Sequence, residues 1–456
     1  MHLFVKNARY LWPGGDQPLM ENASLLIDGS RIVAVGDAQT LAPRAVGART
    51  INAEDLLVMP GLVNTHHHFY QTLTRNFPNV QNAELFEWLI NLYPLWAKLT
   101  AEDFHLSTTI AALELLQSGC TTALDHSYLV PAGQNHLFYR QVDAARETGL
   151  RFHLCRGSMS RSKKDGGLPP DSVVQTEEEI MAETANLVKA VHQPERGGMI
   201  RIVVAPCSPF SVTKELMVEA KKWANLHGLK CHTHLAETKD EEEYCKKVYG
   251  CRPFEMMEQL GWMDHNSFFA HSIHFSKEEV ARMGQARGGV AHCPTSNMRL
   301  GSGIAPIVEM KAAGVPIGLG VDGSASNDSS NMLLEARQCL LLQRVAKGAK
   351  CLTALEALQL ATVGGAEVLG RDDIGKLLPD YEADLIGIRL DSLRQAGSST
   401  DPLAAIVFCG VDRVDLSIVH GELLIHRGKF TRFSDDQLAE LIRRQNERSR
   451  ELYCGA

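Results

Sequence analysis

The sequence lacks several features that would assign a protein to a class at once. No apolar run of about 18 residues occurs in the 456-residue chain, which excludes a conventional membrane-spanning helix. The first residues, Met1 to Lys6, lack the basic start and the apolar centre of a signal peptide. Lys and Arg number 46 against 54 Asp and Glu, and the formal net charge of −8 argues against nucleic acid or an anionic membrane as a partner.

The 11 cysteines also lack a pattern, because none of them forms a Cys-x-x-Cys pair. An odd and dispersed set in a long chain is typical of reduced thiols, so we expect a cytoplasmic protein. Hydrophobic residues at 45% and charged residues at 22% match a globular chain. The length exceeds that of one ordinary domain and favours one large catalytic domain with smaller additions.

Both ends of the chain have short apolar segments that are typical of β-strands. Residues 3–12 and 24–35 form such segments near the N-terminus, and the Asp28-Gly29 turn inside the second predicts a hairpin. Residues 383–388 and 416–425 repeat the pattern near the C-terminus. We therefore expect residues 1–58 and 373–456 to form one small composite β-sandwich domain, with a helix at the C-terminal end.

Between these ends, short apolar segments alternate with stretches of helical length. The segments are 57–64, 121–125, 150–155, 200–205, 229–235, 267–271, 289–293 and 316–321. Thr100-Ala-Glu-Asp103 predicts the start of a helix, and residues 213–227 have helical periodicity. Eight alternations favour an α/β fold, a (β/α)₈ TIM barrel over residues 59–372, with catalytic residues where the strands end. A doubly wound sheet is the alternative.

Two His-x-His pairs stand at the ends of predicted strands. Residues i and i+2 of a strand point to the same side, so His66 and His68 converge while His67 points away. Two neutral imidazoles placed in this way can hold one metal ion. The second pair, His232 and His234, precedes a carboxylate at Glu237. Both of its members have the same parity, so the pattern leaves open which of them would be a ligand.

Two further strand ends carry a single ionisable side chain each. The sixth predicted strand ends at His271, and the eighth is followed by Asp322. A lone His or Asp in such a place carries little information. In a TIM barrel, however, the C-terminal ends of all strands meet at one mouth, so these two residues and the two His-x-His pairs would converge there. This convergence predicts a metal site.

The same segments resemble a known family. Pro60-Gly-Leu-Val-Asn-Thr-His-His-His68, His232-Thr-His-Leu-Ala-Glu-Thr238, the isolated His271 and Gly320-Val-Asp-Gly-Ser324 are similar to the amidohydrolase superfamily, over nearly the whole chain. They resemble most closely its aminohydrolase branch, which deaminates purine, pterin and triazine rings. Within this branch, residues 68–71 and 84–89 are most similar to the enzymes that act on 8-oxoguanine and on hydroxytriazines.

Carried over residue by residue, the resemblance implies four metal ligands: His66, His68, His234 and Asp322. The family's strand-five ligand stands three residues before its catalytic glutamate, which selects His234 over His232. Glu237, His271 and Asp322 are then the acid and base groups, with Asp322 shared between the metal and proton transfer. The metal would lower the pKa of its bound water toward neutrality, and Glu237 would protonate the ring nitrogen beside the amino-bearing carbon.

The resemblance also bears on the number and identity of the metal ions. Binuclear members of the superfamily bridge two ions with a carboxylated lysine or a glutamate at the end of strand four. Here that strand ends in Val204-Ala-Pro-Cys-Ser208, without either residue, so one divalent metal is expected. Cys207 is a less favoured ligand. A site of three His and one Asp accepts Zn²⁺, which is the expected ion, and Fe²⁺ is the alternative.

Aromatic residues are scarce in the chain, at 6%, but they gather after the first barrel strand. Residues 69–96 contain seven of the 29. This segment would overhang the barrel mouth, where flat walls suit a planar heterocycle, although most of the seven are expected only to pack the lid. Gln71, whose amide offers a donor and an acceptor, is the leading candidate for substrate binding, and Trp96 is a weaker one.

A glycine pattern at the eighth strand suggests a different ligand. Gly318-Leu-Gly-Val-Asp-Gly323 matches the G-x-G-x-x-G pattern of dinucleotide-binding sites. The pattern does not open a first βαβ unit, however, and Asp322 occupies the loop where a phosphate would approach. We therefore expect no nucleotide cofactor.

Together these features predict a metal-dependent aminohydrolase that acts on a small heterocycle. The specific expectation is hydrolysis of 8-oxoguanine to urate and ammonia, and a hydroxytriazine (ethyl)aminohydrolase or a pterin deaminase with the same site is the alternative. A barrel relative that lost its ligands and serves a structural role is a third hypothesis, which the joint presence of the site residues argues against. A homodimer is expected at the level of the family.

Overall fold

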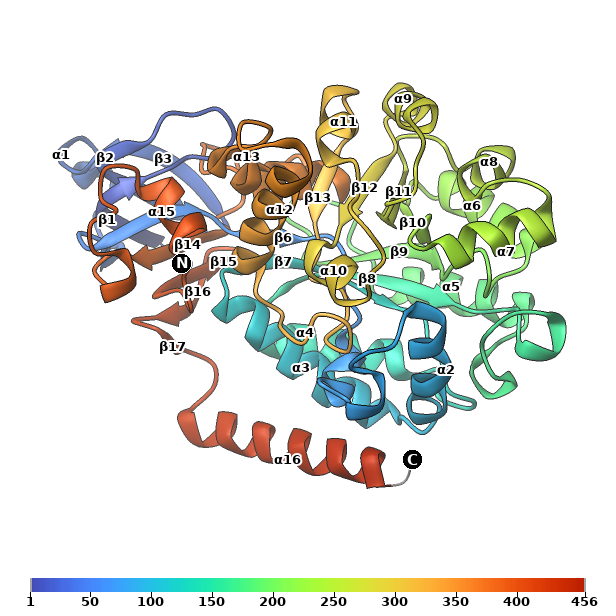
Figure 1. Cartoon of the computed structure of the whole chain (residues 1–456). Coiled ribbons are helices and arrows are strands. Elements are labelled where there is room, and N and C mark those ends of the chain that lie inside the picture. The colour runs from blue at the N-terminus through green and yellow to red at the C-terminus, as the bar shows by residue number, and fades with distance from the viewer. Residues whose placement is uncertain (1, 455–456) are drawn as a thin grey trace.

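The computed structural model describes residues 2–454 and has two parts, a barrel and a β domain beside it (Figure 1). The barrel strands form a parallel sheet in the order β6 (Leu62–Asn64), β7 (Cys120–Ser127), β8 (Arg151–Ser158), β9 (Ile200–Pro206), β10 (Cys231–Leu235), β11 (Ser267–His271), β12 (Gly289–His292) and β13 (Ile317–Leu319). Thr65, just after β6, donates its backbone N–H to the carbonyl of Leu319 in β13 at 2.9 Å. The first and last strands therefore meet, and the predicted TIM barrel is confirmed.

Helices surround this sheet and connect its strands. They are α3 (Ala101–Gln117), α4 (Leu137–Thr148), α5 (Glu177–Val191), α6 (Lys214–Leu226), α7 (Lys239–Tyr249), α8 (Pro253–Gln259), α9 (Lys277–Ala286), α10 (Pro294–Arg299), α11 (Ile307–Ala312), α12 (Met332–Lys347), α13 (Ala354–Gln359) and α14 (Gly365–Val368). As the sequence predicts, Thr100 and Asp103 form a reciprocal capping box at the start of α3, and α6 covers the stretch expected to be helical. Within residues 2–454 no helix is long and apolar enough to cross a bilayer.

Shorter helical elements lie between these. They are α1 (Ala38–Leu41), η1 (Ala42–Arg44), η4 (Lys163–Asp165), η5 (Asp171–Val173), the π-helical turn η6 (Leu360–Gly364), η7 (Leu393–Gln395) and α15 (Pro402–Phe408). In η6 the turn packs against β6 and β13, where the barrel closes. The helix is thus locally widened where it packs against the seam between the first and last barrel strands.

Strands from both ends of the chain form the β domain in one nine-stranded sheet. Its order is β17 (Lys429–Phe430), β16 (Glu422–His426), β15 (Leu416–Val419), β14 (Leu385–Arg389), β5 (Leu56–Pro60), β1 (His2–Leu11), β2 (Met20–Asp28) and β3 (Arg31–Asp37), and β4 (Arg49–Asn52) pairs with β1 beside β5. The two ends are joined where β5 pairs antiparallel with β14. The composite β domain is therefore confirmed, while the boundaries at residues 58 and 372 stay predictions.

The first barrel strand differs from the prediction. Residues 57–64 are not one strand but two, since β5 belongs to the β domain and β6 to the barrel. The break falls at Gly61, whose N–H donates to the carbonyl of Asp384 in the β domain at 3.0 Å, while Leu62 N–H donates to Gly119 O at the barrel at 2.9 Å. An unbroken apolar run hides such a change of partner, because both halves are equally buried.

Two segments pack around the chain that follows β6. The first is a lid made of η2 (Phe69–Thr74), η3 (Pro78–Val80) and α2 (Leu85–Trp96). The second is α16 (Asp435–Cys454), which leaves the β domain and lies against α3 and η2 (Figure 1). Gln445 Nε2 donates to Thr72 Oγ1 at 3.0 Å, and Arg448 forms an ion pair with Asp103 at 2.8 Å. The expected C-terminal helix thus braces η2, which directly follows His68.

Replacing Gly61 with Ala should destabilise the protein, because the new Cβ would lie 2.1 Å from Oγ1 of Thr121. Overpacking of this kind costs about 1–3 kcal/mol, so a lower midpoint of thermal unfolding is expected. Gly36→Ala is the matched control, since a Cβ at that position meets nothing within 4 Å. Equal midpoints for the two variants would contradict a tight junction at Gly61.

Candidate metal centre and substrate cavity

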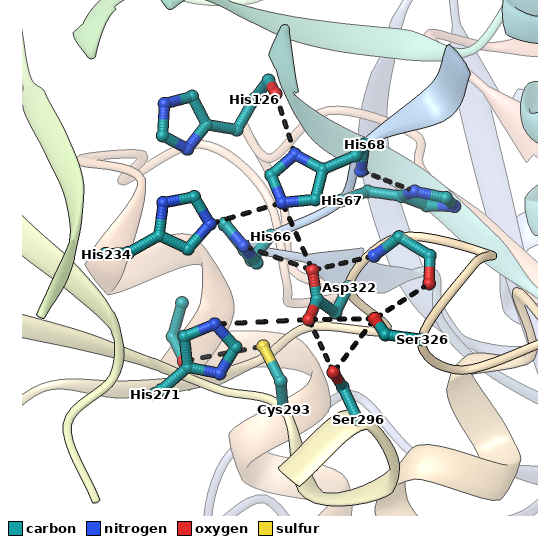
Figure 2. A network of polar contacts seen from close by, with 12 residues as sticks. His66, His67, His68, His126, His234, His271, Cys293, Ser296, Asp322 and Ser326 are labelled. Carbon is teal, nitrogen blue, oxygen red and sulfur yellow. Dashed lines mark hydrogen bonds and ion pairs between the residues drawn. The ribbon is translucent and has the colours of Figure 1, made fainter. Parts of the chain in front are cut away.

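The residues expected to form a metal site come together at the C-terminal ends of the barrel strands (Figure 2). His68 Nε2 lies 3.2 Å from His234 Nε2 and 3.2 Å from Asp322 Oδ1. His66 Nε2 lies 3.4 Å from the same carboxylate oxygen. All four side chains are buried or nearly so. The structure therefore gathers the two His-x-His pairs and the strand-eight Asp at one point, as the strand-end positions predict.

Hydrogen bonds on the far side of two imidazoles determine their tautomers. His68 Nδ1 donates to the backbone carbonyl of His126 at 2.7 Å, and His234 Nδ1 donates to the carbonyl of Cys207 at 2.7 Å. A carbonyl can only accept, so each Nδ1 carries a proton, and in the neutral form of the ring Nε2 is then unprotonated. Each Nε2 then presents a lone pair to the centre. Such outer contacts commonly orient metal-binding histidines.

His66 is oriented by a relay of two rings. His232 Nδ1 donates to the carbonyl of Phe268 at 2.9 Å, which leaves His232 Nε2 as an acceptor. His66 Nδ1 donates to that nitrogen at 2.8 Å, so the buried Nε2 of His66 is also a lone pair and has no hydrogen-bond partner. The geometry therefore separates the two histidines of this pair: His234 Nε2 lies at the centre, and His232 contacts the far side of His66.

Asp322 completes a cluster that contains only acceptors. Its carboxylate accepts hydrogen bonds from Ser296 Oγ at 2.6 Å, from Ser326 Oγ at 3.3 Å and from the Gly323 N–H at 2.7 Å, and three donors favour the ionised form. Burial holds the pKa of His66 well below its usual value and lowers that of His234 to about 3, so these rings are neutral.

Such a cluster fits a divalent cation. Three neutral imidazole nitrogens and a carboxylate repel one another unless a positive charge lies among them. Two ligands of one tetrahedral zinc ion are about 3.3 Å apart, given bonds of about 2.0–2.1 Å, and the separations here are 3.2–3.4 Å. Cys207 is not among the ligand atoms that gather there, and its Sγ lies 3.9 Å from His234 Nδ1, the ring nitrogen that faces away from the centre.

Two further ionisable groups lie beside the cluster. His271 Nδ1 donates to Asn297 Oδ1 at 2.9 Å, so its Nε2 faces the carboxylates of Glu237 at 3.5 Å and Asp322 at 3.9 Å. Burial, reinforced by the charge of Asp322, raises the pKa of Glu237 well above its usual value. This shift favours the protonated carboxyl of Glu237, and His271 lies between that group and the carboxylate of Asp322.

The backbone at the site is strained, and the glycines around it permit close approach. His271 and Asp322 have φ values of +68° and +62°, a region that costs free energy for residues with a side chain and recurs at functional sites. A Cβ at Gly320 would lie 2.8 Å from the Cβ of His66, and one at Gly323 would lie 1.8 Å from Gln71 Oε1. The G-x-G-x-x-G pattern thus reflects packing against the metal centre.

A cavity of about 390 Å³ opens onto the metal centre beneath the lid. The residues that line it are His68, Gln71, Leu85, Trp88, Leu89, Tyr93, Tyr128, Cys207, Ser208, Phe210, His234, Glu237, His271, Leu300, Asp322 and Ser326. Both amide atoms of Gln71 are buried without a hydrogen-bond partner, and so is the hydroxyl of Tyr93. These groups can therefore meet the polar edge of a ligand.

The predicted substrate residues differ in their placement. Gln71 lines the cavity, but Trp96 is not among the lining residues. The indole N–H of Trp96 donates to Thr74 Oγ1 at 3.0 Å, and its ring packs edge-on against Trp88, which does line the cavity. Most of the lid aromatics pack in the same way, as expected. Any effect of Trp96 on a ligand would therefore pass through Trp88.

Two residues at the site escape the sequence prediction. His126, near the end of β7, has a ring nitrogen within 4.8 Å of those of His66, His68 and His234, and its ring stacks on His234 (Figure 2). Glu241 accepts the backbone N–H groups of Ala236 and Glu237 at 2.8 and 2.9 Å and so holds the turn that carries the acid. The position of His126 at a strand end was a usable signal, whereas that of Glu241 inside a helix was not.

The chain belongs to the amidohydrolase family, whose model matches residues 57–424. This range begins in β5 and includes the whole barrel with every residue of the candidate metal centre. The resemblance that the strand-end residues suggest is thereby confirmed.

Individual relatives cover nearly the whole chain. The chain is 49% identical to 8-oxoguanine deaminase of Pseudomonas aeruginosa over 94% of this chain and 95% of that protein. It is 34% identical to hydroxydechloroatrazine ethylaminohydrolase of Pseudomonas sp. strain ADP over 92% and 90% of the two chains. Among solved structures, that of atrazine chlorohydrolase from Arthrobacter aurescens TC1 complexed with zinc has a TM-score of 0.93 at 30% identity, covering 98% of this chain and 100% of that one.

His232→Phe should weaken metal binding by about 10- to 100-fold, the usual effect of losing an outer partner of a ligand. Without the acceptor at His232, the ring of His66 is no longer held with its Nε2 lone pair toward the centre. The metal affinity can be measured by competition with a chromophoric chelator. His292→Phe is the control, because His292 is equally buried but has no hydrogen-bond partner among the described residues. Equal losses in the two variants would show that the relay has no such role.

Proposed function

We propose that this protein is a metal-dependent aminohydrolase that converts 8-oxoguanine and water to urate and ammonia. The observation that carries the proposal is a buried carboxyl, Glu237, kept protonated beside an acceptor-only cluster of three imidazoles and Asp322. Hydrolytic deamination of a ring needs a proton donor next to a cation site. The 49% identity to 8-oxoguanine deaminase supports this substrate over a hydroxytriazine, for which the identity is 34%.

One divalent ion would be held by His66, His68, His234 and Asp322. When bound, it would supply Lewis acidity and lower the pKa of a water molecule toward neutrality. Three nitrogen ligands and one oxygen ligand favour Zn²⁺, and the related chlorohydrolase structure contains zinc. Fe²⁺ is the alternative for the same ligands.

Glu237, His271 and Asp322 would divide the proton transfers. As water adds to the amino-bearing carbon, Glu237 donates its proton to the neighbouring ring nitrogen, so the ring does not take up a negative charge. Asp322 Oδ2 and His271 Nε2, which are 3.9 Å apart, accept the proton that the water loses. The same pair returns that proton to the amino group, the bond between the carbon and this nitrogen breaks, and ammonia leaves. As the C=O bond of the product forms, the proton of the added hydroxyl passes to the Glu237 carboxylate, which restores the acid.

The cavity supports a neutral planar base as the substrate. None of its lining residues is Lys or Arg, so it offers no counter-charge to the phosphates of a nucleotide. Trp88 and Tyr93 supply flat apolar surface, and the amide of Gln71 can pair with a ring edge that has both a donor and an acceptor. The cytoplasmic location and the homodimer expected from the sequence stay predictions.

A substrate panel tests the function directly. The metal-loaded protein should release ammonia from 8-oxoguanine with a higher kcat/KM than from guanine, isoxanthopterin or a hydroxytriazine, and urate should appear at the same rate as ammonia. A higher kcat/KM for a pterin or a triazine would replace the proposed substrate. Absence of turnover on the whole panel by a protein with stoichiometric metal would overturn the assignment as an aminohydrolase.

Glu237→Gln should retain the metal but lose about 10²- to 10⁴-fold in kcat, because an amide cannot deliver the proton. Ammonia release gives the rate, and elemental analysis gives the metal content. Glu243→Gln is the matched control, since Glu243 is exposed on the neighbouring helix α7. Near-normal turnover by Glu237→Gln would remove the acid from its assigned role.

A further inference from the structure

A second cavity lies at the opposite end of the barrel from the metal centre. Its empty space is about 750 Å³, and its lining includes the residues at the N-terminal ends of β8, β9 and β10. Five of these residues are His, Lys or Arg: His153, His192, Arg201, Lys230 and His265. No Asp or Glu is among the lining residues, although the chain as a whole is acidic. The cavity is therefore electropositive.

The cations are placed there by the register of the barrel strands. His153 in β8 pairs with Arg201 in β9, and Arg201 has the same parity as Val203, which belongs to the barrel interior. Lys230 stands just before β10, and its carbonyl accepts the N–H of Val204 in β9 at 3.0 Å. The two cations therefore occupy neighbouring strands at the bottom of the barrel.

Neither Arg201 nor Lys230 forms an ion pair within residues 2–454. Arg201 donates to the carbonyls of Pro194 and Glu195 at 3.2 Å, and its buried Nε has no partner. Lys230 Nζ donates to the carbonyl of His265 at 2.6 Å. A backbone carbonyl carries no full negative charge, so neither cation is in direct contact with a carboxylate among the described residues.

The carboxylates near these cations are already paired with others. Asp373 accepts two hydrogen bonds from the guanidinium of Arg371, at 2.7 and 2.9 Å, and Asp372 forms an ion pair with Arg196 at 2.7 Å. On the side of Lys230, Asp264 pairs with Lys221 at 2.7 Å, and Glu367 pairs with Arg287 at 2.5 Å. These four carboxylates thus act on Arg201 or Lys230 only from a distance, while each is in direct contact with another cation.

Burial disfavours the charged form of both cations. It lowers the pKa of Lys230 to about 8, and burial together with the charge of Arg371 lowers that of Arg201 to about 10. An anion in the cavity would favour the charged forms of both. His192 accepts the N–H of Ile202 at its Nδ1 at 2.9 Å, which leaves its proton on Nε2 as a further donor.

We propose that this cavity is a second ligand site, which binds a small doubly charged oxyanion, phosphate or a phosphate ester, at Arg201 and Lys230. Two fixed positive charges match a dianion, and a guanidinium together with an ammonium supplies the donors that phosphate oxygens accept. The site is independent of the metal centre, because a layer of apolar inward side chains, including Cys155, Val203 and Phe268, lies inside the barrel between them.

Binding of inorganic phosphate to the metal-loaded protein tests the proposal. Titration calorimetry at constant ionic strength should show saturable binding, and Lys230→Met should weaken it by at least about tenfold, since the variant keeps the apolar stem and removes the charge. Arg201→Gln should act in the same direction. Lys222→Met, on the exposed side of α6, is the matched control and should bind phosphate as the wild type does.

The source of the anion and a competing site are distinguished in the same experiment. Tighter binding of ribose 5-phosphate or glycerol 3-phosphate than of phosphate would assign the site to a phosphate ester, and equal binding would assign it to the free ion. Phosphate held at the metal centre would compete with the substrate and would bind equally to the wild type and Lys230→Met. That result, or the absence of saturable binding at millimolar phosphate, would overturn the proposal.

Discussion

The site depends on one electrostatic constraint: three imidazole nitrogens and a carboxylate oxygen face one another at 3.2–3.4 Å in a buried space. Each neighbouring group maintains this state. Two backbone carbonyls accept hydrogen bonds from Nδ1 of His68 and His234, and a third accepts one from Nδ1 of His232. Nε2 of His232 in turn accepts a hydrogen bond from Nδ1 of His66. The barrel thus favours a cation by directing these N–H donors away from the centre, and it places the carboxyl of Glu237 immediately outside.

The interior of the barrel is organised in layers along its axis. Ionisable groups occupy the C-terminal end, apolar side chains occupy the middle, and unpaired cations occupy the N-terminal end. The same strands serve both ends, since β9 runs from Arg201 toward Cys207, whose carbonyl orients His234, and β10 runs from Lys230 to His234 itself. Period-two alternation places all of these side chains on the inner face. The same alternation along β9 and β10 therefore places the metal-site residues at one end of the barrel and the cations at the other.

Much of this arrangement could be predicted from the sequence, because strand ends and parity depend only on local order. His66 and His68 follow from their spacing, and the barrel follows from the alternation of strands and helices. What could not be predicted depends on contacts across the fold. Parity could not separate His232 from His234, an apolar run concealed the change of partner at Gly61, and an indole inside a lid does not reveal, as for Trp96, whether it faces a cavity or another indole.

The junction at Gly61 ties the β domain to the metal centre. The chain passes from β5 to β6 through this one residue, and His66 follows shortly after the end of β6. A displacement of β5 in the β domain would therefore displace the imidazole of His66 before it displaced the rest of the barrel. Selection for metal retention should in consequence also act on the core of this nine-stranded sheet, although none of its strand residues lines the cavity at the metal centre. Natural variation in that sheet should be restricted most along β5 and β14, the strands that join the two ends of the chain.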